Sequence, residues 1–254
     1  RPKKEQVAEV LRLCLTYQKE YLIIGNGSNL LVSDKGISGV VIEIGKQMDE
    51  ITVDGTTIYA QAGAMLSKTA HAALEAGLTG MEFAAGIPGC VGGAVVMNAG
   101  AYGGEMKDIL KSVTVLTADG QEKELTPGEL DMSYRHSSIT EERYMVLGVT
   151  IALEAGSQEQ IRAKMEELKE KRVEKQPLEY PSAGSTFKRP EGYFAGKLIM
   201  DAGLRGFQVG GAAVSEKHCG FVINKEKATA SDVYRLIQEV QQEVYRQFGV
   251  KLET

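Results

Sequence analysis

The sequence predicts an α+β fold, because strand-like and helix-like segments are mixed along the chain without strict alternation. The chain has 254 residues, of which 43% are hydrophobic and 25% charged, a composition typical of folded globular proteins. At about 150 residues per domain, this length suits one large domain or two smaller ones. Glycine is in excess, with 29 residues, and the places where these glycines cluster are the most informative feature of the sequence.

Charge and cysteine content exclude several classes of protein. The formal net charge is −5, which argues against a surface built for nucleic acid. The three cysteines form no CxxC pair, so we expect neither a disulfide framework nor a metal site, and a reducing, cytoplasmic location fits best. No run of about 18 apolar residues is present, and no signal-peptide core begins the chain, so we expect no membrane segment.

The first part of the chain is expected to be a helix followed by strands. Apolar residues at helical spacing predict a helix over 3–18, and YLIIG predicts a strand over 21–25. Strand-like segments LLVSD, VVIEIG and ITVDGTTIYAQAG follow, and then a helical face over 65–76. Residues 77–104 hold nine glycines, and each Gly inside a regular element costs about 0.5–1 kcal/mol relative to Ala. We therefore expect a long loop there.

The second part begins with a hairpin around Asp119 and a buried strand over 144–153. A heavily charged helix over 157–174 comes next, and we expect the domain boundary at its start. A polar loop, KQPLEYPSAGSTFKRP, and the strand-like GFVIN precede a last helix, which is expected to begin at an N-cap Ser231 and to stop at Gly249.

Two loops of small residues suggest a cofactor. GNGSN (25–29) and GIPGCVGGAVVMNAGAYGG (86–104) are rich in glycine, which lets backbone N–H groups approach an anion closely. The first loop resembles the dinucleotide fingerprint GxGxxG, but Leu30 replaces its third glycine and strand-like residues follow, so a Rossmann fold is rejected. Either loop alone could be a tight turn. Together they favour a bulky dinucleotide.

An ordered set of motifs extends this interpretation to the whole chain. GNGSNLL, GIPG, GGAVVMNAGAYG, YRHS, GSTFKRP, AGLRG, KHCGFVIN and FGVKLET occur in this order, and the set resembles the UDP-N-acetylenolpyruvoylglucosamine reductase family, in its shorter type II branch. The resemblance implies an FAD-binding domain of the vanillyl-alcohol-oxidase (PCMH) type over 1–153, lacking its first strand. A smaller α+β substrate-binding domain over 157–254 would follow it. The implied reaction is reduction, by NADPH through FAD, of the enolpyruvyl ether of a UDP-sugar in bacterial wall synthesis.

The same resemblance implies two catalytic residues, whose chemistry can be checked. Hydride addition to one carbon of the double bond leaves negative charge on the other, beside a carboxylate, so a fixed cation and a proton donor are needed. Arg135 of YRHS matches the cation, and its planar guanidinium suits a carboxylate. Ser185 of GSTFKRP matches the proton donor, which requires nearby cations because a hydroxyl is a weak acid. The plainer alternatives are a salt-bridge arginine and a loop hydroxyl.

Further contacts are implied in the same way. Lys188, Arg189 and Lys175 are candidates to assist the serine, whereas His71, His218 and Cys90 are expected to be structural. The implied substrate-binding residues are Tyr134, Lys175 and Arg189. The implied cofactor-binding residues are Asn26, Gly27, Ser28, Asn29, Gly86, Ile87, Pro88, Gly89, Gly92, Gly93, Asn98 and Gly100.

The two ends of the chain differ from what the family resemblance implies, and two other functions compete with the reductase. The family's fold begins with a strand ahead of residue 1 and places a catalytic glutamate just beyond Thr254, so we expect the chain to be part of a longer protein. Glu253 would not replace that glutamate, because successive side chains on a strand point to opposite faces. A flavin-dependent alcohol oxidase of the same superfamily and a non-catalytic nucleotide-sugar binding protein are the alternative functions. The oligomeric state stays open.

Overall fold

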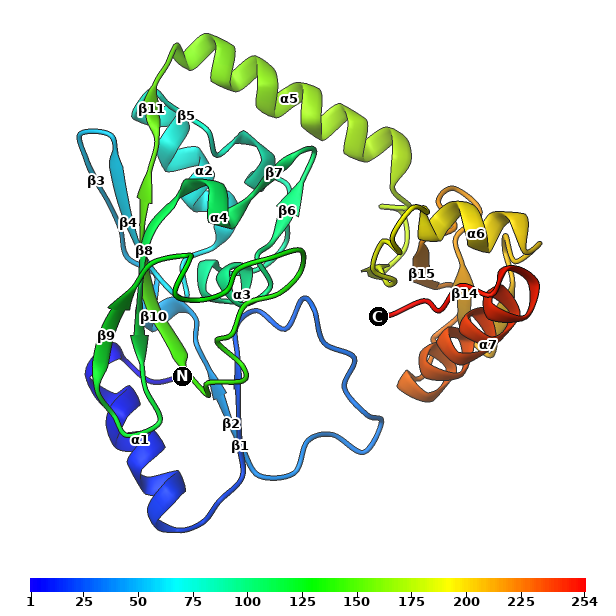
Figure 1. Ribbon diagram of the computed structural model, residues 1–254, viewed down its shortest axis with the longest axis horizontal. Helices are drawn as coiled ribbons and strands as arrows, with labels where there is room; N and C mark the ends of the chain where they lie inside the picture. The colour runs from blue at the N-terminus through cyan, green and yellow to red at the C-terminus, as the bar shows by residue number, and fades with distance from the viewer. The chain divides into compact units, whose positions relative to one another are not determined.

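The computed structural model describes all 254 residues, which form two compact units (Figure 1). The first unit comprises Arg1–Ser28 and Ser38–Lys169, and the second comprises Asn29–Ile37 and Glu170–Thr254. The division between these two units falls inside the long helix α5 (Gln158–Lys175). A short segment from the first half of the chain therefore belongs to the second unit.

The core of the first unit is a five-stranded antiparallel sheet in the order β3-β4-β10-β8-β9. Its register places Ile58 opposite Ile151 and Val113 opposite Val149, and all four side chains are buried. The expected hairpin around Asp119 and the expected strand over 144–153 are confirmed. The strands are β3 (Ile51–Asp54), β4 (Thr57–Gln61), β8 (Leu110–Leu116), β9 (Glu122–Leu125) and β10 (Met145–Ala152).

A smaller parallel pair, β1 (Tyr21–Ile24) and β2 (Val40–Glu43), follows the first helix, α1 (Lys4–Thr16). The helix and the first strand lie where the spacing of apolar residues predicted them. The strand expected at LLVSD (30–34) is wrong, because that segment has no strand partner. A turn forms there instead, in which the Gly36 N–H donates to the Ser33 carbonyl at 2.8 Å.

The glycine-rich region 77–104 is more regular than expected. The helix before it, α2 (Leu66–Glu75), ends as predicted, with Gly77 in the left-handed region at φ 67°. Gly92 and Gly93, however, lie inside a helix, which corrects the expectation of a continuous loop. Tertiary packing outweighs the propensity of Gly92, whose backbone lies against Ala62. The elements here are β5 (Leu78–Thr79), η2 (Glu82–Ala84), α3 (Val91–Val96), β6 (Gly100–Ala101), β7 (Gly104–Glu105) and α4 (Met106–Ile109).

The second unit has a four-stranded antiparallel sheet in the order β12-β15-β14-β13, with two helices beside it (Figure 1). Leu236, Val240 and Val244 bury one face of the last helix, and Gly249 ends it at φ 68°, as predicted. The N-cap is Thr229 and not Ser231. The elements are β12 (Ser182–Ser185), α6 (Ala195–Asp201), β13 (Gln208–Val209), β14 (Ala212–Val214), β15 (Phe221–Asn224) and α7 (Ala230–Phe248).

The remaining features of the fold concern membrane helices, metals and thiols. None of the helices combines the length and the apolar character needed to span a bilayer. No group of three or more histidine, cysteine or acidic side chains is arranged to hold a metal ion. The three cysteines are buried free thiols. A short two-stranded sheet, formed by β11 (Glu154–Ala155) and β5, comes directly before α5 in the chain.

Candidate functional site

The two glycine-rich loops lie against each other in the first unit. The Ser28 hydroxyl donates to the Pro88 carbonyl at 3.1 Å. A Cβ on Gly25 would lie 2.1 Å from Cys90 Sγ, and a Cβ on Gly89 would lie 2.9 Å from Ser28 Oγ. The structure thus joins two segments that sequence spacing alone could not connect, and positions 25 and 89 at this junction leave no room for a side chain.

The glycines of these loops divide into two groups. A Cβ on Gly92 would lie 2.9 Å from the Ala62 Cβ, and one on Gly100 would lie 2.6 Å from the Gly104 carbonyl oxygen, so packing of the protein itself requires both glycines. Gly27 differs, because its φ is 68° and no atom lies within 4 Å of the position of a Cβ. Gly103 of the second loop is open in the same way, with φ 89°. Gly27 and Gly103 are therefore glycines at which an external group could approach the backbone closely.

The exposed residues of the first loop have the chemistry that a phosphate-bearing cofactor needs. Asn26, Gly27 and Ser28 are exposed, and they offer neutral donors together with backbone free of a Cβ. Asn29 is also exposed but belongs to the second unit. In the second loop, Gly86 and Gly93 are exposed and Ile87 is half-buried. The small and polar residues of the first unit thus fit an FAD molecule.

Asn98 differs from the other predicted cofactor contacts because its side chain is fully buried. Its amide nitrogen donates to the Glu105 carboxylate at 2.6 Å and to the Ser133 carbonyl at 2.9 Å. Its amide oxygen accepts from the Lys107 N–H at 2.9 Å. Both amide hydrogens are thus used inside the protein, so the geometry does not support an FAD contact through this amide.

Arg135 lies in a tight turn, Ser133–His136, here called the Arg135 turn. The two end residues exchange N–H···O bonds, both 3.1 Å long. Arg135 has φ 55°, a left-handed conformation that non-glycine residues seldom adopt and that occurs often at functional sites. The Tyr134 ring centre lies 5.0 Å from the guanidinium carbon. The sequence therefore places a charged residue where a turn would ordinarily favour glycine.

The guanidinium of Arg135 is anchored on the second glycine loop. It donates to the Gly100 carbonyl at 2.7 Å and to the Asn98 carbonyl at 3.4 Å. Nearby, the Ser137 hydroxyl donates to the Val96 carbonyl at 2.7 Å. A guanidinium has five N–H donors, so the remaining ones can meet an anion while these bonds hold the group in place. Arg135 itself is half-buried.

In the second unit, Ser185 lies exposed at the end of β12, opposite Phe221 of β15. Beside it, the Thr186 N–H donates to the Gly220 carbonyl at 3.0 Å. A Cβ on Gly220 would lie 3.6 Å from Ser185 Oγ and 3.2 Å from His218 Nδ1. His218 is thus a near neighbour of the predicted proton donor. Sequence reasoning missed this proximity, although both residues lie in motifs it had noticed.

The surroundings of His218 affect both its pKa and the orientation of its ring. Burial lowers the pKa of His218, and the positive charge of Lys175 lowers this pKa further. Its Nδ1 accepts from the Gly220 N–H at 3.1 Å, so the ring proton resides on Nε2. Lys175 is exposed at the end of α5, close enough to this group to act on it electrostatically.

The other basic residues after Ser185 have protein partners. The Arg189 guanidinium carbon lies 4.0 Å from the centre of the Phe194 ring, and its Nε donates to the Tyr193 carbonyl at 3.3 Å. The Lys188 N–H donates to the Glu253 carbonyl at 2.7 Å, and its ammonium lies 3.6 Å from the Glu253 carboxylate. Glu253 is thus paired with a cation that follows the predicted proton donor.

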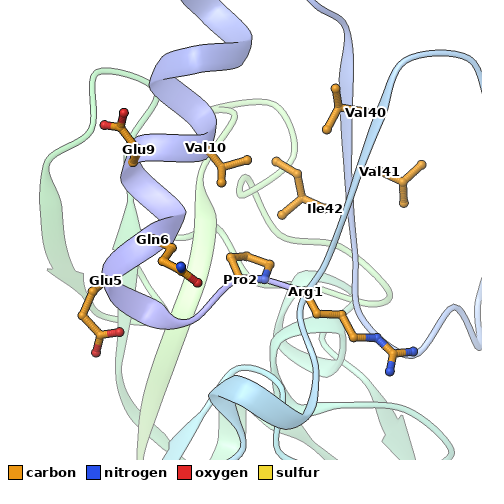
Figure 2. Close-up of a pocket in the computed structure, with 9 residues that line it drawn as sticks. All are labelled: Arg1, Pro2, Glu5, Gln6, Glu9, Val10, Val40, Val41 and Ile42. Carbon is orange, nitrogen blue, oxygen red and sulfur yellow. The ribbon is translucent and has the colours of Figure 1, made fainter.

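The predicted residues therefore gather in two groups, one in each unit. The two loops, Tyr134 and Arg135 belong to the first unit, apart from Asn29, and Ser185, Lys175 and Arg189 belong to the second. A separate cavity of about 540 Å³ lies between α1 and β2. Figure 2 shows Pro2, Val10 and Ile42 pointing toward one another in it. None of the predicted site residues lines this cavity.

Comparison with known proteins gives a consistent result over the whole chain. Residues 2–126 match a model of an FAD binding domain, and residues 176–254 match the C-terminal domain of UDP-N-acetylenolpyruvoylglucosamine reductase. The reductase of Agathobacter rectalis is 58% identical over 99% of this chain and 84% of its own length. That of Clostridium perfringens strain SM101 is 55% identical over 99% and 82%. The crystal structure of the reductase from Thermus caldophilus superimposes with a TM-score of 0.85 at 36% identity, covering 99% of this chain and 87% of that one.

Proposed function

The chain belongs to the UDP-N-acetylenolpyruvoylglucosamine reductase family, and from this premise we propose that Arg135 and Ser185 are the residues that carry its reaction. The predicted fold class, an FAD-binding domain followed by a smaller α+β domain, is confirmed. The protein is an FAD-containing oxidoreductase of peptidoglycan precursor synthesis that uses NADPH. Its own residues must therefore hold the cofactor, orient a UDP-sugar and manage charge and protons.

Arg135 is proposed to stabilise the negative charge that develops on the substrate. Bound FAD supplies the hydride that adds to one carbon of the enolpyruvyl double bond. The charge left at the other carbon spreads onto the adjacent carboxylate, where a fixed guanidinium stabilises it. The bonds from Arg135 to the Gly100 and Asn98 carbonyls support this role, because they hold the guanidinium before substrate arrives.

Ser185 is proposed to donate the proton that completes the reduction. Its exposed hydroxyl can reach a ligand, but an alkoxide forms there only if positive charge lies near. The electrostatic effect of Lys175 on neighbouring His218 supports such an environment. Because burial lowers the pKa of His218 and its Nδ1 already accepts from the Gly220 N–H, we assign the positive charge near the serine to Lys175 and not to the histidine.

The two glycine loops are proposed to bind FAD. Asn26, Gly27, Ser28 and Asn29 would contact it through side chains and open backbone, as would Gly86, Ile87, Pro88 and Gly93. Gly89 is buried and would support this stretch by packing against Ser28. Gly92 and Gly100 would support the loop without touching FAD, because the protein's own packing requires a glycine at both positions. Tyr134, Lys175 and Arg189 are proposed to bind the UDP-sugar substrate, in which the diphosphate calls for cationic partners. The three buried free thiols suit a cytoplasmic location.

The family membership over nearly the full chain carries this proposal, and a two-step experiment tests it. Addition of FAD should give a yellow protein with the visible flavin band. NADPH should bleach that band, and UDP-N-acetylglucosamine enolpyruvate should restore it without oxygen. Steady peroxide production from a simple alcohol, with no recovery on the UDP-sugar, would favour the alcohol oxidase. A protein that stays colourless with FAD would favour the non-catalytic binding protein.

A further inference from the structure

The Asn98 amide connects three separate pieces of the first unit. It donates to Glu105 on β7, accepts from the Lys107 N–H on α4, and donates to the Ser133 carbonyl at the start of the Arg135 turn. The Glu105 carboxylate is itself oriented, because its other oxygen lies 3.0 Å from the Lys107 ammonium. Asn98 therefore stands at the centre of a buried polar network.

This network acts on Arg135 through both the backbone and the side chain. The Ser133 carbonyl that Asn98 holds also accepts the His136 N–H that closes the turn. The carbonyl of Asn98 itself accepts from the Arg135 guanidinium. Asn98 thus fixes Ser133, the first residue of the Arg135 turn, and also accepts a hydrogen bond from the Arg135 guanidinium.

The conformation of Asn98 fits this double role. Its φ is 39°, in the left-handed region, which asparagine tolerates better than most residues. That conformation turns the main chain just after α3, where the carbonyls of Asn98 and Gly100 meet the guanidinium. A buried amide with both hydrogens bonded is also costly to disturb, because any change leaves an acceptor unpaired.

We infer that Asn98 is a positioning residue for Arg135 and not a contact of the cofactor. This inference rests on the proposed role of Arg135 in the reaction. Removing the bond from Asn98 to the Ser133 carbonyl should displace the guanidinium without changing how FAD binds. A displacement of about 1 Å at a reacting centre can slow the step about 10²-fold.

The variant pair Asn98→Asp and Asn98→Asp with Glu105→Gln isolates this bond. Asn98→Asp alone removes both donors and places two carboxylates together, so it should lower the Tm strongly. Glu105→Gln then restores the missing hydrogen bond in the reverse direction, because the Gln amide donates to Asp, and it removes the charge repulsion. The Ser133 carbonyl is then without its amide donor and faces a carboxylate instead. Glu105→Gln alone is the reference for losing the carboxylate that pairs with Lys107 and caps α4.

The double variant should have a Tm above that of Asn98→Asp but below that of the wild type, because a buried carboxylate now faces the Ser133 carbonyl. Its Kd for FAD and its bleaching by NADPH should be unchanged. Its flavin should then be reoxidised by the UDP-enolpyruvyl sugar about 10²-fold more slowly. Adding Arg135→Lys to it should slow this step no further than Arg135→Lys alone, because both changes act on one group. Two control variants separate the possible causes. Thr229→Ala should lower the Tm at an unchanged reoxidation rate, which shows the effect of lost stability alone. Asn26→Ala should weaken FAD binding, which shows the effect of a lost cofactor contact.

Three outcomes would overturn the inference. A raised Kd for FAD in the double variant would make Asn98 a cofactor contact. Normal reoxidation in the double variant beside slow reoxidation in Arg135→Lys would reject the positioning role while the proposed function stands. Normal reoxidation in Arg135→Lys would reject the proposed role of Arg135, and the inference would fail with it.

Discussion

The Asp34 carboxylate accepts two hydrogen bonds from Ser231, one from its N–H at 2.9 Å and one from its hydroxyl at 2.6 Å. It also accepts from the Ala230 N–H at 2.7 Å, and the Thr229 hydroxyl accepts from the Asp232 N–H at 3.1 Å. The first N–H groups of α7, which a helix cannot satisfy by itself, are thus all paired. A segment just after the first glycine loop is thereby fixed within the second unit.

This cap predicts a loss of stability in acid. Hydrogen bonds from the backbone and side chain of Thr229 lower the pKa of Asp232 to about 2, and the Ser231 hydroxyl lowers the pKa of Asp34. A carboxyl group whose pKa is lower in the folded state stabilises it above the unfolded pKa, near 3.9, and loses this effect as the pH falls toward the folded pKa. The Tm should therefore drop between about pH 4 and pH 2. The drop in Tm should be shallower in Asp232→Asn and the same as in the wild type in a control variant, Asp54→Asn. An equal drop in the wild type and both variants would show that Asp232 is not the source of the acid sensitivity.

Arg135→Lys should bind FAD normally and be bleached by NADPH, but its reoxidation by the UDP-sugar should fall about 10²- to 10³-fold. A compact ammonium cannot reproduce the planar pair of donors, nor hold the Gly100 and Asn98 carbonyls at the same time. Stopped-flow absorbance separates the two half-reactions. Arg143→Lys is a matched control, because Arg143 is an exposed arginine of the same unit with φ 54°. A normal rate in Arg135→Lys would remove Arg135 from the reaction.

Ser185→Ala should let NADPH reduce the flavin at the normal rate, while the second half-reaction slows by about 10²- to 10⁴-fold because the proton donor is gone. Ser182→Ala, on the same exposed strand, should leave both halves unchanged. Equal slowing of both half-reactions in Ser185→Ala would indicate a structural defect and not loss of an acid.

Gly25→Ala should weaken FAD binding and lower the free energy of unfolding by about 1–3 kcal/mol, because the new methyl group would lie 2.1 Å from Cys90 Sγ. Adding Cys90→Ala should restore both properties, since the remaining Cβ at position 90 would be 3.8 Å away. FAD titration and thermal unfolding of the single and double variants measure this. A double variant as defective as the single one would show that the loops are not joined at this contact.

Glu253→Gln should leave both half-reactions close to normal, because the Glu253 side chain is 76% exposed and is paired with Lys188. The expected change is a small loss of stability, of the size that exposed ion pairs give, about 0–1 kcal/mol. Loss of the second half-reaction in this variant would instead make Glu253 an acid of the site.

Local patterns in the sequence were enough to predict many of the elements. The helical spacing before Tyr17, the hairpin at Asp119 and the glycine that ends α7 all depend on neighbours within a few positions. Where a distant partner decided the outcome, the prediction was wrong. Gly92 lies in a helix because Ala62 packs against it, and the cap of α7 is Thr229, assisted by Asp34.

The sequence by itself determined the family, through an ordered set of motifs, and with it the kinds of residue that the reaction needs. The tertiary structure decided what each of these residues touches. It placed the Asn98 amide against Ser133, 35 positions away, and the Asp34 carboxylate against Ser231, 197 positions away. Hydrogen bonds of this kind form only when packing of the core brings the groups within about 3 Å, and no periodicity along the chain records that distance.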